Sequence, residues 1–222
     1  MKRIALIILS VATIIAGSVS CQKENLQENS AFEGSASVGT ARATIGGREV
    51  DVNWVQLWAG GPKFADYNVG ATYGKAESYG GYYAWGGSQE KVDDHNTNNT
   101  GSGNLSRDDD TATKLWGSNW RMPTRAEFQG LIDNCDVEWT TVRDVNGHKF
   151  TGKGAYASYS VFLPAAGCYS GGVCDQGDDG YYWSSTPNGS NDAYYLDFCL
   201  ERRGVSNSER GNGYSVRAVL AE

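Results

Sequence analysis

The cysteines are the residues whose type and spacing most directly allow chemistry. Besides Cys21, which follows a short apolar segment, the chain carries Cys135, Cys168, Cys174 and Cys199. Behind an N-terminus that indicates export, an even number of cysteines predicts disulfides. Cys168 and Cys174 flank a short glycine-rich stretch, so we pair them as the clasp of a hairpin. Cys135 is then left to pair with Cys199, which would close a larger loop and stabilise the fold more.

A metal site is the alternative use of these cysteines. The sequence holds no Cys-x-x-Cys pair, and its two histidines are His95 and His148. The set therefore lacks the ligand spacing of structural zinc sites. We expect disulfides and no transition metal.

Carboxylates could hold a different ion. From Ser88 to about Thr113 the chain is polar, and it includes Asp93, Asp94 and the run 108–110. Calcium takes oxygen ligands from irregular loops of this kind. The spacing matches no EF-hand, so a solvated surface loop is the favoured interpretation and Ca²⁺ stays open as the alternative.

Patterns that would indicate an enzyme do not stand out. We find no Ser-His-Asp or Cys-His constellation, and no glycine-rich phosphate loop follows a predicted strand. The carboxylates cannot be paired for acid–base work from the sequence. We therefore expect no catalytic residues and no cofactor.

Residues 1–20 read as a secretory signal. Lys2 and Arg3 precede an apolar run over 4–16, and small residues follow it. The run is shorter than the roughly 20 residues of a transmembrane helix. The residues before Cys21 resemble a bacterial lipobox, which predicts cleavage there and a lipid on Cys21. Ordinary signal-peptidase cleavage is the alternative. We expect a lipid-anchored outer-membrane protein that faces the cell surface.

Composition divides the rest of the chain into a tether and one domain. Residues 21–48 are rich in Ser, Glu, Asn, Ala and Gly without a sustained apolar period, which is typical of a flexible tether. Residues 49–222 have the length of a single domain. The net charge of −7 argues against nucleic acid, whose binders present a basic stripe. We expect a monomer that contacts the membrane through the lipid on Cys21.

One helix is predicted with clear boundaries. Thr124 can cap its first turn, and Glu127 completes a capping box three residues later. Pro123 stops the preceding strand. Apolar residues then recur at helical spacing over 125–135.

Alternating apolar residues bounded by glycine or proline predict short strands. We expect them at 50–58, 64–69, 79–86, 158–164, 180–185, 192–200 and 214–220. Asn146-Gly147 is a strong two-residue turn, which predicts a hairpin of strands 137–142 and 148–151. The stretches 186–191 and 201–213 are polar, and we expect turns there.

Six short motifs follow one another in a set order. They are Asn68–Ala71, Tyr79–Gly86, Trp120–Thr124, Phe162–Gly167, Gly180–Ser185 and Tyr214–Arg217. With these motifs the chain resembles, over about residues 50–222, the Fibrobacter succinogenes major paralogous domain family. These are exported bacterial domains, often lipoproteins, related to the C-type lectin-like fold. The resemblance implies an α+β fold with small twisted antiparallel sheets, one or two flanking helices and long loops.

The resemblance carries no settled activity, and a fold alone does not give a function. Some lectin-like domains bind sugars through Ca²⁺ with Glu-Pro-Asn or Gln-Pro-Asp and Trp-Asn-Asp motifs, which Thr186–Asn188 and Asn191-Asp192 match only in part. Formylglycine-generating enzymes share the wider fold, but their metal-binding cysteine pair conflicts with disulfides. Variable proteins of diversity-generating retroelements carry hypermutated positions late in this fold. The stretch 181–214 has a composition suited to that, and ordinary polar loops are the alternative.

The favoured hypothesis is a lipoprotein whose lectin-like domain binds an extracellular glycan or protein through its late loops. The expected binding residues mix rigid aromatics with adaptable polar groups. They are Tyr181, Tyr182, Asn188, Asn191, Asp192, Tyr194, Arg202, Arg203, Asn207 and Asn212. A structural or adhesive component of the envelope or a pilus tip is the second hypothesis, and an enzyme of the formylglycine-generating kind is the third.

Overall fold

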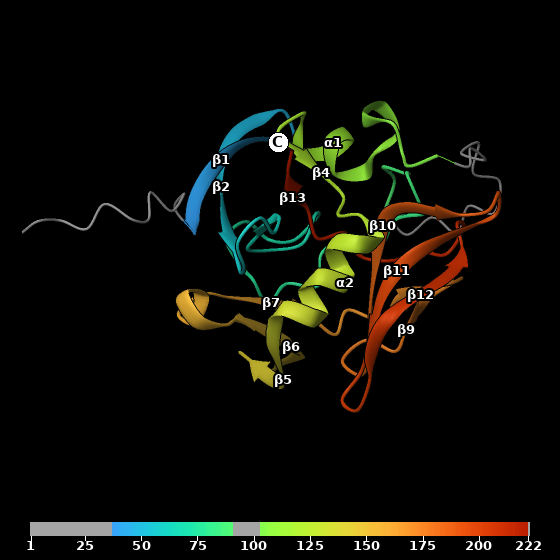
Figure 1. The fold of residues 1–222 in the computed structure, drawn as a ribbon. Helices are drawn as coiled ribbons and strands as arrows, with labels where there is room; N and C mark the ends of the chain where they lie inside the picture. The colour runs from blue at the N-terminus through green and yellow to red at the C-terminus, as the bar shows by residue number, and fades with distance from the viewer. Residues whose placement is uncertain (1–36, 91–102, 222) are drawn as a thin grey trace, which may run out of the picture. The chain divides into compact units, whose positions relative to one another are not determined.

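The computed structural model describes residues 37–90 and 103–221, which belong to one compact unit spanning Gly34–Glu222 (Figure 1). The predicted signal, the lipidation site Cys21 and His95 lie outside the described residues. Within them, no helix is both long enough and apolar enough to span a membrane.

Over residues 37–90 and 103–221 short strands dominate, with two α-helices and two 3₁₀ turns. The helical elements are η1 (Arg107–Asp109), α1 (Thr111–Trp116), α2 (Arg125–Asn134) and η2 (Gly154–Tyr156). The early strands are β1 (Val38–Ile45), β2 (Arg48–Gln56), β3 (Lys63–Ala65), β4 (Trp120–Arg121), β5 (Cys135–Val142), β6 (Val145–Gly152) and β7 (Ser160–Pro164). The late strands are β8 (Cys168–Tyr169), β9 (Val173–Cys174), β10 (Gly180–Asn188), β11 (Asp192–Phe198), β12 (Arg203–Glu209) and β13 (Val219–Leu220). These elements form several small antiparallel sheets, which confirms the α+β class.

The first sheet has the order β1-β2-β3-β13-β4 and corrects the predicted tether. Residues 38–48 are not linker, because β1 pairs with β2 along its whole length. Gly46 and Gly47 make the connecting turn with φ of 57° and 76°, a conformation that favours glycine. Alanine and threonine give β1 little apolar signal of its own, and β2 supplies the apolar partner that a single strand lacks.

The second sheet has the order β5-β6-β7, and its hairpin turn lies at other residues than the sequence predicts. The hairpin reverses at Arg143 and Asp144, with φ of 48° and 66°, so the expected turn at Asn146-Gly147 is wrong. Gly147 lies inside β6 opposite Pro164. A Cβ there would approach the Leu163 carbonyl oxygen to 2.2 Å, so close strand packing, rather than a turn, requires this glycine.

The third sheet, β10-β11-β12, contains a strand that the sequence analysis placed in a turn. The polar stretch 201–213 supplies β12, which pairs with β11 over seven residues. Polar side chains suit this strand because it pairs on one edge only within the described sheets. The helix α2 packs on this sheet (Figure 1).

Arg217 is fully buried where the N- and C-terminal parts of the chain meet. Its guanidinium donates to Asn68 Oδ1 at 2.9 Å and to the carbonyls of Ala65 and Phe162 at 3.0 Å each. Burial lowers the pKa of Arg217 to about 10. The residue therefore ties three distant segments together and is not available to a ligand.

Candidate functional site

A groove of about 460 Å³ lies between the open end of the β1–β2 hairpin and the segment 158–160 at the start of β7. Its walls come from the start of β1, the end of β2 and the residue that follows β3. This volume falls within the range of small-molecule sites.

Two polar side chains form a pair in the groove. Asn53 Nδ2 donates to Asp66 Oδ2 at 2.9 Å, and the Asp66 backbone N–H donates to the Asn53 carbonyl at 3.1 Å. Asp66 Oδ1 is buried and has no hydrogen-bond partner within the described residues. A buried carboxylate oxygen without a donor costs free energy, and because this oxygen is shielded it is not a contact point for a ligand in the groove.

Aromatic and aliphatic side chains supply the rest of the groove. Trp54 and Tyr159 are half-buried, and Val38 is exposed. Gly39 lies opposite Trp54 across the strand pair, and a Cβ on it would come within 2.5 Å of the indole. Gly39 therefore lets the indole lie across β1. The sequence analysis missed this site because Trp54 and Tyr159 are far apart in the chain. Only the Asn-Trp pair in an alternating strand hinted at it.

The predicted late-loop residues do not gather on one surface. The β10–β11–β12 register puts Tyr182 beside Leu196 and Val205, on the face that α2 covers, and Tyr181 beside Asp197, on the opposite face. Tyr194 and Asn207 are cross-strand partners on the α2 side, where the Arg125 guanidinium lies 4.1 Å from the Tyr194 ring centre.

Tyr182 is the clearest correction. It is fully buried, its hydroxyl donates to the Pro164 carbonyl at 2.6 Å, and it accepts from Asn68 Nδ2 at 3.1 Å. Burial raises the pKa of Tyr182. The aromatic signal in this strand belongs to the core, and Tyr182 does not face a ligand.

Tyr181 belongs to an aromatic cluster on the other face. Its ring stacks on Tyr214 at 5.2 Å, and Tyr195 and Trp183 complete the group at 4.9 and 4.4 Å from Tyr214. Burial raises the pKa of Tyr181. This face of the sheet is filled by the chain itself.

The remaining predicted residues fall at opposite ends of the sheet. Asn188, Asn191 and Asp192 form the β10–β11 turn, where buried Arg210 donates to the Asp192 and Gly189 carbonyls.

At the other end of the sheet, Arg202 pairs with Asp197 and Asp179, and its hydrogen bond to Asp197 raises its pKa. Arg203 is exposed at the start of β12, and Asn212 donates to Ser208 Oγ at 2.8 Å.

One of the two predicted disulfides is present. Cys168 and Cys174 are bonded and clasp the β8–β9 hairpin, as expected. The Cys135–Cys199 pairing is wrong, because both residues are free thiols. Cys135 begins β5 inside a hydrophobic cluster, whereas Cys199 follows β11 in a different sheet. Burial raises the pKa of Cys135 to about 11, which keeps its thiol protonated.

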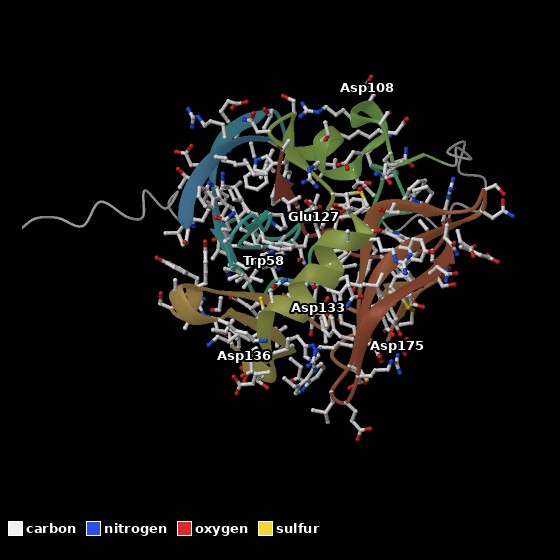
Figure 2. All side chains as sticks on the ribbon, in the orientation of Figure 1. Trp58, Asp108, Glu127, Asp133, Asp136 and Asp175 are labelled. Carbon is white, nitrogen blue, oxygen red and sulfur yellow. A yellow bond between two sulfur atoms is a disulfide. The ribbon has the colours of Figure 1, made fainter. Side chains whose placement is uncertain are left out.

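A metal at the cysteine clasp would require its reduction. The two sulfur atoms and a carboxylate oxygen of Asp175 (Figure 2) lie within 4.8 Å of one another. In the disulfide neither sulfur is a thiolate, and thiolates are the form that binds metal.

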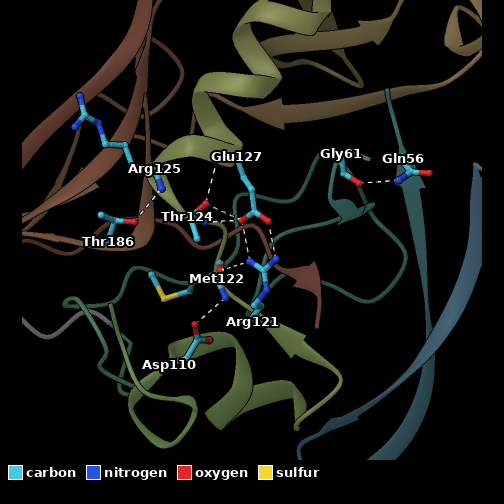
Figure 3. Close-up of polar contacts among 9 residues, drawn as sticks. All are labelled: Gln56, Gly61, Asp110, Arg121, Met122, Thr124, Arg125, Glu127 and Thr186. Atoms are coloured by element: carbon cyan, nitrogen blue, oxygen red, sulfur yellow. Dashed lines mark hydrogen bonds and ion pairs between the residues drawn. The ribbon is translucent and has the colours of Figure 1, made fainter. Parts of the chain in front are cut away.

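The start of α2 forms a smaller hollow of about 170 Å³ (Figure 3). The predicted capping box is confirmed, with Thr124 and Glu127 bonded reciprocally. Arg121 holds Glu127 through two hydrogen bonds of 2.8 and 2.6 Å. Burial pushes the pKa of Glu127 upward, but the bonds from Arg121 and Thr124 outweigh it and hold the pKa below its ordinary value. These side chains already form hydrogen bonds with one another, so the hollow presents few polar groups for a ligand.

The last residue of the acidic run 108–110, Asp110, has a structural role. Asp110 caps α1 through Thr113 N at 2.9 Å and accepts from Met122 N at 2.8 Å. Burial raises its pKa, partly offset by these bonds. The residues 91–102 of the proposed calcium loop lie outside the described part of the chain.

Comparison with known proteins gives one match. Residues 132–219 match the model of a family described as a domain of unknown function (DUF8237). The matched region runs from α2 to β13 and leaves β1, β2 and β3 outside it. No curated protein and no solved structure matches the chain.

Proposed function

We propose that this protein is an exported, lipid-anchored binding protein of the outer membrane, and that the groove beside β1 is where it holds an extracellular ligand. In this proposal, the domain has the C-type lectin-like fold of the major paralogous domain family. The Cys168–Cys174 disulfide supports export, because disulfides persist in oxidising compartments.

One observation carries the binding proposal. The groove places the side chains of Trp54 and Tyr159 beside the polar Asn53–Asp66 pair. Apolar walls with a few convergent polar groups are the usual features of a ligand site. The late-loop residues do not offer this combination, since their rings and charges contact one another.

A binding screen tests the proposal. The full lipidated chain, purified in detergent, is screened against glycans and cell-surface proteins, with Trp54→Ala and Trp58→Ala as matched variants. Trp58 (Figure 2) is also half-buried, but it packs on Phe64 and is not one of the residues that line the groove. We expect saturable binding that Trp54→Ala removes and Trp58→Ala keeps. Equal binding by both variants would overturn the groove as the site.

The structural alternative remains distinct from this proposal. A spacer or pilus-tip component would co-purify with a filament and would not depend on Trp54. The Cys168–Cys174 bond weighs against the enzyme alternative, which needs free metal-binding thiols.

A further inference from the structure

We propose that β12 joins two copies of this chain, by pairing antiparallel with β12 of the second copy about a two-fold axis at Ser206. The β10–β11–β12 sheets of the two copies would then form one continuous sheet. A dimer differs from the monomer that we expect from the sequence alone, in which 201–213 forms turns. The contact lies outside the groove, because no residue of β12 is among those that line it.

The outer edge of β12 is open. β12 is the last strand of the order β10-β11-β12, and no further strand pairs with it among residues 37–90 and 103–221. Such an edge presents backbone N–H and C=O groups to another chain unless proline, lysine, a bulge or a covering segment protects it. β12 contains no proline or lysine, and its register with β11 is regular over all seven residues.

The backbone groups of β12 point alternately toward β11 and toward the open edge. Cys199 N donates to the Arg202 carbonyl at 2.9 Å, and Arg210 N donates to the Asn191 carbonyl at 3.0 Å. These bonds lie just beyond the two ends of the β11–β12 pairing, and both place the even-numbered residues of β12 in the pairs that bond to β11. The residues that present N–H and C=O groups outward are Arg203, Val205, Asn207 and Glu209.

The sequence of β12 is self-complementary about Ser206. In an antiparallel pair centred there, Arg203 faces Glu209 of the second copy, and Val205 faces its Asn207. All four are outward residues, so their backbone groups exchange hydrogen bonds in this register. The Glu209 carbonyl also accepts from Asn212 N at 3.2 Å, within its capacity of two bonds.

Charge complementarity favours a second copy as the partner. Arg203 and Glu209 are exposed near the two ends of the strand, and opposite charges directly across a strand pair are stabilising. The two-fold axis repeats this ion pair at the other end. An isologous interface requires such a self-complementary pattern, whereas an unrelated extended peptide that pairs with the same edge does not.

The other long strands at sheet edges lack this combination. The carbonyl of Arg42 in β1 accepts from Trp120 Nε1 at 3.0 Å, and the carbonyl of Phe162 in β7 accepts from Arg217 at 3.0 Å. β5 carries two acidic residues and no basic one, so two copies of it would not complement each other. β12 is therefore the edge best suited to pair with itself.

The decisive experiment reverses the charges at the ends of β12. Arg203→Glu and Glu209→Arg each place like charges opposite one another twice in the dimer, whereas a mixture of the two variants restores opposite charges at both ends. Self-association of the full lipidated chain in detergent is measured by sedimentation over the micromolar range. Sharing of a detergent micelle would affect all variants alike and cannot produce the difference.

We expect the native chain to dimerise, and each single variant to self-associate about tenfold more weakly. The mixture should associate with native affinity. A monomeric native chain, single variants that associate like the native chain, or a mixture that stays monomeric would overturn the inference.

A cysteine variant tests the position of the axis independently. Ser206→Cys, in a Cys199→Ser background, places two thiols in a non-hydrogen-bonded pair whose Cα atoms lie about 4.5 Å apart, within reach of a disulfide. Ser190→Cys in the same background is the matched control, since Ser190 is exposed on the β10–β11 turn. Oxidation should give a reducible dimer with Ser206→Cys and not with Ser190→Cys. Equal cross-linking at both positions, or none at Ser206→Cys, would contradict pairing through β12.

Discussion

The groove beside β1 and the β10–β11–β12 sheet contain similar residue types but differ in how those residues are used. Both hold tyrosine, tryptophan, asparagine and aspartate. In the sheet, Tyr182 bonds Pro164 and Asn68, and Arg202 pairs with Asp197. In the groove, Asp66 keeps a buried oxygen without a donor within the described residues.

The difference lies in what the side chains contact: in the sheet they contact one another, whereas Trp54 and Tyr159 line an open volume of about 460 Å³. An aromatic and polar composition is typical of binding loops, but the same composition builds a sheet when the groups contact one another. Each prediction below tests whether the sheet is structural and the groove is free to bind.

The largest effect is expected from Tyr182→Ala. It removes a buried ring and the two hydrogen bonds that its hydroxyl makes with the Pro164 carbonyl and Asn68 Nδ2. We expect a loss of about 4 kcal/mol in the free energy of unfolding, against about 1 kcal/mol for half-buried Tyr159→Ala in the groove. Denaturant unfolding measures both. Equal losses would erase the contrast between the two regions.

Acid should weaken the packing of β6 against the β10–β11–β12 sheet through His148. Burial and the nearby Arg203 charge lower the pKa of His148 from 6.5 to about 4, and its ring stacks on Phe198 of β11 at 4.6 Å. Because the folded pKa is below the unfolded one, its contribution is complete above pH 6.5 and is lost as the pH falls toward 4.

The expected loss is about 3 kcal/mol of unfolding free energy. Unfolding at pH 7 and pH 4 is compared between the native chain and His148→Phe, which keeps the stacking and removes the titration. The variant should lose about 3 kcal/mol less on acidification. Parallel pH profiles would show that another group sets the acid sensitivity.

The cysteine clasp should contribute a smaller amount. Replacing Cys168 and Cys174 together by serine removes a bridge across a separation of six residues. The short loop predicts a loss of about 2 kcal/mol, measured by thermal unfolding with and without reductant. The unfolding temperature of the variant should not change with reductant. Cys199→Ser is the matched control because Cys199 is a free thiol.

The smallest effects are expected at two of the predicted late-loop residues. Asn191 and Asn207 are exposed on the β10–β11 turn and on β12. Alanine at each should change stability by less than about 0.5 kcal/mol and leave the binding affinity of the groove unaltered. A loss of binding at Asn191 with unchanged folding would return the site to the late loops.

Local rules determined what the sequence could predict. The capping box at Thr124 and Glu127 and the helix that follows are confirmed, because capping involves neighbouring residues only. The clasp of Cys168 and Cys174 is likewise a short-range contact. The α+β class follows from the alternation of apolar residues with one helical segment.

Tertiary structure decided the features that depend on distant partners. The strand β1 forms because β2 pairs with it, and β12 forms because β11 does, although their own sequences resemble linker and turn. Asn146-Gly147 lies in the strand β6 and forms no turn, because β6 packs closely against β7.

The same reason separates the two regions compared above. Whether Tyr182 or Tyr159 faces solvent depends on what covers the segment that carries it, and that is set by long-range packing. The sequence by itself determined the helix, the clasp and the class. Only the tertiary structure brought Trp54, Asp66 and Tyr159 together in a groove.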